Sequence, residues 1–180
     1  MGKWLLFFFL VIAMGLVVYW IMIWKGMHSF LFAWILNFVL MMVVLFFTQL
    51  IKPRLESKYF NSKNWESEGK IYEWMGVNLF RKLLVLVGWE KLNKKENPVK
   101  KNSDALLHLE YSTRQSEFGH LIILLIVLAF TFLVSVRSGF HQALWLISLN
   151  ILLNFYPIIV QRYNRPRIAN LIRNFHQKII

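Results

Sequence analysis

The sequence has no cysteine, and only 17% of its 180 residues are charged. The lack of cysteine excludes a disulfide framework, a thiolate metal site and a cysteine nucleophile. The scarcity of charge goes with 57% hydrophobic residues and a mean hydropathy of +0.48. A water-soluble domain of this size could not cover so much apolar surface with polar groups. The chain is therefore expected to lie in a lipid bilayer.

Acidic residues are also few, and the formal net charge is +12. In a soluble protein such an excess of positive charge would suggest a nucleic-acid partner. Here the basic residues flank apolar runs, which favours contact with anionic lipid headgroups instead. Membrane lipids are therefore the expected partners, and nucleic acid is not.

Four stretches are long enough and apolar enough to cross a membrane. A spanning helix needs about 20 mostly apolar residues, and four such runs contain no charged side chain. Turn residues at Lys25–Gly26 and Arg137–Gly139 separate the members of each pair. The sequence therefore predicts an all-α integral membrane protein with four transmembrane helices, arranged as two hairpins. The expected spans are Trp4–Trp24, about His28–Ile51, Phe118–Val136 and Ser138–Val160.

These spans divide the chain into four predicted segments. Residues 1–51 form an N-terminal transmembrane hairpin and residues 118–160 a C-terminal one, joined by a loop over residues 52–117 and followed by a basic tail over residues 161–180. Within the loop, about residues 70–91 are apolar and aromatic but interrupted by charges. The uncharged part is too short to span, so we expect an amphipathic helix that lies in the membrane interface.

The distribution of positive charge predicts the orientation of the chain. Nineteen of the 21 Lys and Arg residues lie in the N-terminus, the long loop or the tail, which share one side if the chain crosses four times. Segments rich in Lys and Arg stay in the cytoplasm. Both termini and the long loop are therefore expected to be cytoplasmic, in a protein of the cell membrane.

Polar side chains gather where the third span begins. Thr113, Glu117 and His120 are spaced to share one face of a helix, and Arg114 lies three residues before Glu117. Polar groups near bilayer depth are costly, so their presence points to a functional role.

The fourth span carries a second polar face. Asn150, Asn154, Pro157 and Gln161 recur at helical spacing, and the run Arg162–Arg167 follows. Because the last two spans are expected to be antiparallel, both polar faces should meet at the cytoplasmic surface of the membrane.

Simpler interpretations of these groups stay open. Arg114 and Glu117 could form only an ion pair at a helix start, the arginines after the fourth span could be topology anchors, and the asparagines could only hold helices together. The spacing Glu117-x-x-His120 matches half of a di-metal carboxylate motif, but the other half is missing. No metal site is therefore predicted.

Three sequence blocks together resemble a known family. The first is Gln161–Arg167 (QRYNRPR), followed by Leu171 and Arg173; the second is Trp65–Tyr72, ahead of Arg81 and Lys82; the third is Thr113–His120. From about Asn64 onward the chain resembles the glycosyl-4,4'-diaponeurosporenoate acyltransferase family. The resemblance implies a bacterial membrane enzyme that puts a fatty acyl chain on the sugar of a glycosylated carotenoid, as in staphyloxanthin-type pigments.

The residues suggest how such a transfer would proceed. His120 is the candidate general base, and Glu117 one turn away would orient it or stabilise its charged form. Arg162, Arg165 and Arg167 would bind donor phosphates through forked hydrogen bonds, and Pro166 is expected to turn Arg165 out of the helix. Asn154, Gln161 and Asn164 would donate to the developing oxyanion. The resembling blocks add further candidate substrate-binding residues: Thr113, Arg114, Tyr163, Tyr72 and Lys82.

The expected partners are an acyl donor, with acyl-CoA as the co-substrate, and a glycosylated lipid or carotenoid acceptor. No bound cofactor is predicted. Two other functions remain open at this stage. One is a non-catalytic scaffold whose arginines bind anionic lipid; the other is a small lipid transporter, which the absence of ionisable residues deep in a span makes less favourable.

Overall fold

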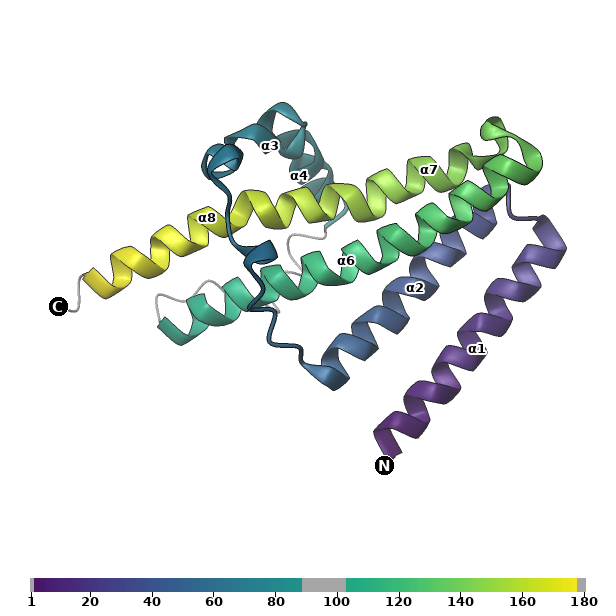
Figure 1. The fold of residues 1–180 in the computed structure, drawn as a ribbon, viewed down its shortest axis with the longest axis horizontal. Coiled ribbons are helices and arrows are strands. Elements are labelled where there is room, and N and C mark those ends of the chain that lie inside the picture. The colour runs from purple at the N-terminus through teal and green to yellow at the C-terminus, as the bar shows by residue number, and fades with distance from the viewer. Residues whose placement is uncertain (1, 89–102, 178–180) are drawn as a thin grey trace. The chain divides into compact units, whose positions relative to one another are not determined.

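The computed structural model of the protein describes residues 2–88 and 103–177. Every regular element in these two ranges is a helix (Figure 1), which confirms the predicted all-α class. The four long helices are α1 (Gly2–Lys25), α2 (Phe30–Ile51), α6 (Ser103–Ser138) and α8 (Tyr156–Gln177). The shorter elements are η1 (Lys58–Phe60), η2 (Asn64–Gly69), α3 (Lys70–Trp74), α4 (Val77–Leu86), η3 (Phe140–Ala143), α7 (Leu144–Asn150) and the π-helical turn η4 (Ile151–Phe155).

The described residues include four helical segments long and apolar enough to cross a membrane: 2–25, 30–51, 103–138 and 140–175. In α1 only Ile21 is buried, whereas Leu5, Phe8 and Trp20 are each more than half exposed. A helix that is apolar all round is at home in lipid rather than in water. The protein therefore has the helices of a multi-pass membrane protein. Their arrangement as two hairpins across the bilayer stays a prediction.

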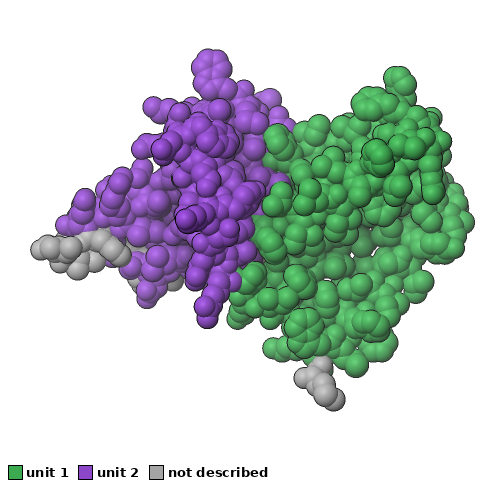
Figure 2. All heavy atoms as spheres, viewed as in Figure 1, with its two compact units in different colours: residues 1–53, 118–155 green, residues 54–117, 156–180 purple. Residues whose placement is uncertain are grey.

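The chain folds as two compact units, coloured separately in Figure 2. Unit 1 contains residues 1–53 and 118–155, and unit 2 contains residues 54–117 and 156–180. Helix α6 runs unbroken from Ser103 to Ser138, so it contributes its first part to unit 2 and its second part to unit 1. Glu117 and His120, which the sequence places on one helical face, therefore belong to different units.

Unit 1 is built around apolar packing between helices. The turn after α1 has Gly26 at φ +77°, and Ser29 then caps α2 by accepting a hydrogen bond from the backbone N–H of Phe32 at 3.1 Å. Helix α2 packs against both α1 and α7. The buried core combines residues from all parts of the unit: Ile21, Phe32, Ala33, Leu36, Val44, Ile123, Val127, Val134, Ala143, Leu146 and Leu149.

A π-helical turn interrupts the last span of unit 1. Residues Ile151–Phe155 form η4, just before Pro157 in the sequence. A proline cannot donate a backbone hydrogen bond, and its ring clashes with the carbonyl four residues earlier in an α-helix, here that of Leu153. A wider turn relieves this clash. The π-helical turn also carries Asn154, whose side chain is buried.

Unit 2 contains the loop that follows α2. Its short helices η2, α3 and α4 pack against α8. On α4, Val77 and Phe80 are buried, whereas Leu79, Leu83 and Leu86 recur at helical spacing on the exposed side. This second apolar face is typical of a helix that contacts lipid.

Two expectations for unit 2 were wrong. The single interfacial helix expected over about residues 70–91 is instead broken into α3 and α4, because Gly76 adopts φ +82° between them; residues 89–91 lie outside the described residues. Pro166 does not turn Arg165 out of the helix, since α8 continues through it to Gln177. Buried hydrogen bonds made by Arg162 and Arg165 hold this part of α8 in place despite the proline.

We expect Gly69→Ala to destabilise unit 2. Gly69 has φ +91°, and a Cβ there would lie 3.0 Å from the backbone oxygen of Tyr163. Both the left-handed backbone and the overpacking cost free energy, each about 1–3 kcal/mol. Thermal unfolding in detergent should show a clearly lower Tm.

Gly76→Ala is the matched control for this prediction. Gly76 has a similar φ of +82°, but a Cβ there would meet only the hydroxyl of Tyr156, at an ordinary 3.6 Å. The two variants therefore share the backbone strain and differ in the close contact. Equal losses of Tm would mean that the approach of Gly69 to α8 is unimportant.

Candidate active site

A buried carboxylate lies at the centre of unit 2. Glu117 on α6 is fully buried, and its two oxygens accept hydrogen bonds from two arginines of α8. Arg162 donates from Nε at 2.7 Å, and Arg165 donates from Nη2 at 2.5 Å. These arginines are three residues apart, so both project toward the same face of α6.

Arg162 also binds the loop that precedes α3. Its Nη1 donates to Oε1 of Glu66 at 2.5 Å, and its Nη2 donates to the backbone oxygen of Tyr59 at 3.0 Å. The Glu66 carboxylate is itself buried and accepts two more hydrogen bonds, from the hydroxyl of Tyr72 at 2.8 Å and from the backbone N–H of Lys63 at 2.9 Å. Arg162 therefore joins two buried carboxylates from distant parts of the chain.

Arg165 is 3% exposed and also makes three hydrogen bonds. Beside its bond to Glu117, it donates from Nη1 to the backbone oxygen of Phe60 at 2.7 Å and from Nε to the hydroxyl of Thr113 at 3.3 Å. All three nitrogens of each guanidinium thus donate to protein acceptors. The role of Arg162 and Arg165 in binding donor phosphates stays a prediction, and it would require these hydrogen bonds to be exchanged.

The four charged groups of this cluster, Glu66, Glu117, Arg162 and Arg165, balance one another. Burial alone would raise the pKa of the Glu66 carboxyl, but the hydrogen bonds from Lys63, Tyr72 and Arg162 outweigh it and hold that pKa below its usual range. Burial and the bond to Glu66 raise the pKa of Tyr72 well above its usual value. Tyr72 therefore remains a hydrogen-bond donor, and Glu66 remains an anion, at any physiological pH.

A more open basic patch lies beside this cluster in unit 2. The guanidinium of Arg167 stacks 3.5 Å from the ring centroid of Tyr163, and that of Arg81 lies 5.4 Å from the same ring. Glu73 accepts from both the Tyr163 hydroxyl and Arg167, each at 3.2 Å. The Arg167 side chain is 42% exposed and Lys82 is also exposed. This patch has cationic groups that an anionic ligand can reach.

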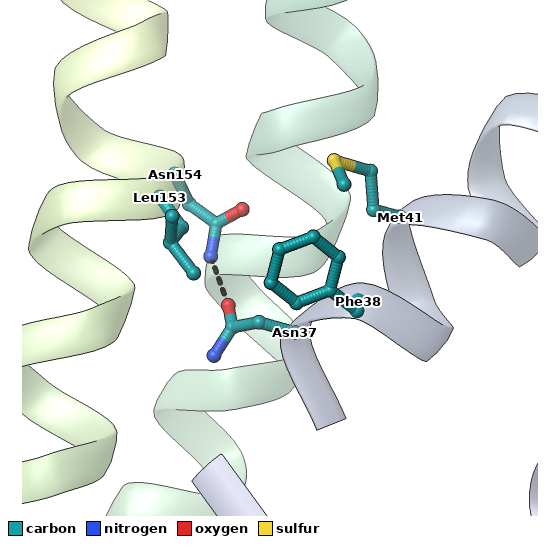
Figure 3. Close-up of a pocket in the computed structure, with 5 residues that line it drawn as sticks. All are labelled: Asn37, Phe38, Met41, Leu153 and Asn154. Carbon is teal, nitrogen blue, oxygen red and sulfur yellow. Dashed lines mark hydrogen bonds between the residues drawn. The ribbon is translucent and has the colours of Figure 1, made fainter. Parts of the chain in front are cut away.

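Unit 1 holds the candidate base in a different environment. Nδ1 of His120 lies 3.4 Å from Oδ1 of Asn154. The Asn154 amide nitrogen donates to the side-chain oxygens of Asn37 at 2.6 Å and Asn150 at 2.8 Å. A small pocket of about 30 Å³ adjoins Asn37 and Asn154 and is otherwise apolar (Figure 3). The described partner of His120 is therefore an amide rather than Glu117.

Most of the residues predicted from the sequence lie in one of three places: the buried cluster, the open basic patch or the surroundings of His120. Thr113, Glu117, Arg162, Arg165 and Tyr72 form the buried cluster; Tyr163, Arg167 and Lys82 belong to the open patch; His120 and Asn154 lie together in unit 1. Arg114 lies outside them, paired with Glu110 at 2.6 Å and with the backbone oxygen of Leu55 at 3.1 Å. Gln161 and Asn164 are half-buried, and their amides bond to no residue that the structure describes.

Sequence reasoning missed Glu66, Glu73 and Asn37 as members of these sites. Asn37 could have been found, because it is a polar residue in the middle of an otherwise apolar span, where such groups are costly. Glu66 lies in the resembling block Trp65–Tyr72, but nothing in the sequence gives it a partner, and nothing local distinguishes Glu73 from the other acidic residues of the loop. Only the fold shows which carboxylates meet the arginines.

The comparison with protein families decides the assignment. The family model described as glycosyl-4,4'-diaponeurosporenoate acyltransferase matches residues 56–174. The chain belongs to this family. It is therefore an acyltransferase that acts on a glycosyl carotenoid, as the resemblance implied. The match covers the buried cluster, the open patch and His120 with Asn154. Neither the curated proteins nor the solved structures include a match.

We predict that Glu117→Gln strongly destabilises this acyltransferase. The change leaves two buried guanidiniums without their shared anion, and breaking a buried ion pair typically costs about 3–5 kcal/mol. Thermal unfolding in detergent should show a large loss, with a reduced yield of folded protein. Glu110→Gln is the control, since its pair with Arg114 is partly exposed and such pairs contribute about 0–1 kcal/mol. Similar stability of the two variants would contradict the central role of Glu117.

The lowered pKa of Glu66 predicts acid sensitivity. A carboxyl with a depressed pKa stabilises the fold at pH values above its unfolded pKa of about 4.3, and this contribution is lost as the pH falls through its folded pKa. Tm should therefore change little between about pH 7 and pH 5 on account of this group, and then fall. Glu66→Gln should be less stable at neutral pH and should lose less Tm on acidification; equal acid profiles would contradict the assignment.

Proposed function

We propose that the protein transfers a fatty acyl group from acyl-CoA to a hydroxyl on the sugar of its glycosyl carotenoid acceptor, with His120 as the general base. The observation that carries this proposal is the imidazole of His120, held by the buried amide of Asn154 on an apolar helix. A sugar hydroxyl must lose its proton to attack a thioester, and histidine is the side chain suited to accept it near neutral pH.

One base is enough for the whole transfer, because the proton that it removes is later returned to the leaving group. His120 takes the proton of the sugar hydroxyl as its oxygen attacks the thioester carbonyl, which forms a tetrahedral intermediate with a negative oxygen. The C–S bond then breaks, and the imidazolium returns the proton to the departing thiolate. The products are the sugar ester and free CoA.

In this proposal Asn154, rather than Glu117, orients the imidazole of His120. The Glu117 oxygens accept from Arg162 and Arg165, whereas Asn154 has its oxygen beside Nδ1 of His120. Both N–H bonds of the Asn154 amide go to other asparagines, so it has none left for an oxyanion. The oxyanion role expected for Gln161 and Asn164 stays a prediction; their amides bond to no described residue.

For the donor phosphates we propose the open patch rather than the buried arginines. Arg167 is partly exposed, and Arg81 and Lys82 lie in the same unit. Arginine binds phosphate through forked, charge-assisted hydrogen bonds. Arg162 and Arg165 would then hold the cluster of Glu117 and Glu66 together, with Thr113 and Tyr72 completing it.

We further propose that the enzyme lies in the cell membrane with its four spans as two hairpins. The bias of Lys and Arg supports cytoplasmic termini and a cytoplasmic loop. This orientation places unit 2, with its basic patch, where acyl-CoA is available. The apolar spans would accommodate the polyene of the acceptor and the acyl chain of the product.

His120→Ala tests the proposal. Loss of a general base typically lowers the rate by about 10²–10⁴-fold. We expect this loss in acyl transfer measured with acyl-CoA and glycosyl carotenoid in detergent, with the ester quantified by mass spectrometry. His108→Ala is the matched control, because His108 is exposed on the same helix. Near-normal ester formation by folded His120→Ala protein would refute the assignment.

Arg167→Ala tests the donor site. Removal of a phosphate-binding guanidinium should raise the KM for acyl-CoA about 10-fold, since a hydrogen bond to a charged group contributes about 1.5–3 kcal/mol, and should change kcat little. Arg54→Ala removes an exposed arginine of the same unit and serves as the control. An unchanged KM for acyl-CoA in Arg167→Ala would place the donor elsewhere.

A further inference from the structure

Three buried asparagines in unit 1, Asn37, Asn150 and Asn154, are linked by hydrogen bonds between their side-chain amides; we call them the relay. Each amide can take only one of its two flipped orientations, and the reason begins with Asn37 and Asn150. Nδ2 of Asn37 on α2 donates to the backbone oxygen of Ala33 at 2.8 Å, and Nδ2 of Asn150 on α7 donates to the backbone oxygen of Leu124 at 3.1 Å. A backbone carbonyl can only accept. Both amides must therefore keep their nitrogen toward the carbonyl and their oxygen toward the interior of the relay.

The two amide oxygens determine the orientation of the third asparagine. Oδ1 of Asn37 and Oδ1 of Asn150 both accept from Nδ2 of Asn154, at 2.6 Å and 2.8 Å (Figure 3 shows the first of these). A flipped Asn154 would set its oxygen against two other oxygens. Its nitrogen is thus fixed by two acceptors, and its own oxygen must face Nδ1 of His120, 3.4 Å away.

We propose that Asn37 and Asn150 are positioning residues that set the tautomer of His120. Because Asn154 presents an acceptor, the imidazole carries its proton on Nδ1 and keeps the lone pair of Nε2 free to take the substrate proton. This inference rests on the proposed role of His120 as the base. The asparagines would then do more than hold helices together. Helix association needs hydrogen bonds between the amides but does not need each amide to have one orientation.

The three asparagines of the relay are buried. Asn37, Asn150 and Asn154 are each at most 3% exposed, and their amides bond to one another and to backbone carbonyls. Asn37 lies outside the residues 56–174 that the family model matches.

The tautomer can be measured without reference to activity. In protein labelled with ¹⁵N-histidine and reconstituted in detergent micelles, the two ring nitrogens of a neutral imidazole have distinct chemical shifts for N–H and lone-pair nitrogen. The His120 signals are assigned by their absence from His120→Ala. We expect wild-type His120 to carry its proton on Nδ1. A proton on Nε2 in the wild type would overturn the proposal, even if His120→Ala abolishes acyl transfer.

Asn37→Leu removes the first acceptor while roughly keeping the side-chain volume, so the adjacent pocket does not enlarge. We expect part of His120 to move to the Nε2–H tautomer and kcat to fall by about 10-fold or more, since loss of a tautomer-fixing group can cost about 10⁴-fold. The KM for acyl-CoA should stay unchanged. Asn150→Leu should act in the same direction.

Thr48→Val is the matched control. Thr48 is another buried polar residue of α2, but among the described residues its hydroxyl bonds only to the backbone oxygen of Leu45. It should leave both the tautomer and kcat unchanged. If Asn37→Leu behaves like Thr48→Val, or if both variants lose kcat equally without a change of tautomer, Asn37 has only a structural role and the proposal is wrong.

Discussion

The Glu117 carboxylate, shared between Arg162 and Arg165, is the interaction on which unit 2 depends. A carboxylate with no exposure is stable only if positive groups and hydrogen bonds replace the water it has lost. The two arginines supply the positive charge and the hydrogen bonds. Other N–H groups of the same guanidiniums donate to Glu66 and to the backbone oxygens of Tyr59 and Phe60. One buried anion thereby fixes α6, α8 and the loop that precedes α3. A lysine at either position would carry an equal charge but would lack the planar fork of donors that the guanidinium supplies.

The family's sequence block Gln161–Arg167 thus combines two kinds of residue. Arg162 and Arg165 face inward and each donates three hydrogen bonds to protein acceptors, whereas Arg167 stacks on Tyr163 and remains partly exposed. A run of arginines after a membrane span invites a single explanation, such as topology or phosphate binding. The three arginines instead differ in burial. The difference follows from helical spacing, since Arg162 and Arg165 share a face of α8 on which Arg167 does not lie.

How far the sequence predicted the structure depended on the range of the interactions. Hydropathy and length found the four apolar segments that are long enough to cross a membrane, because the cost of exposing backbone in lipid leaves few alternatives to a helix. Proline and glycine were harder. The π-helical turn before Pro157 follows from local sterics, yet Pro166 is accepted within α8 and Gly76 breaks an expected helix. The bond from Arg162 to Glu66 could not be predicted, since the two residues are 96 positions apart and the sequence does not say which loop carboxylate meets which arginine.

The two units solve the problem of buried polarity in different ways. Unit 2 neutralises full charges with one another, which is possible because four of them converge. Unit 1 contains no such set among its described residues, and at membrane depth a carboxylate beside a histidine would itself need a cation. Neutral amides avoid that need. Backbone carbonyls fix the orientation of Asn37 and Asn150, these two fix the orientation of Asn154, and Asn154 then orients His120 without adding a charge. An imidazole oriented in this way can remain neutral before the reaction, as a base must, and become charged only while it holds the substrate proton.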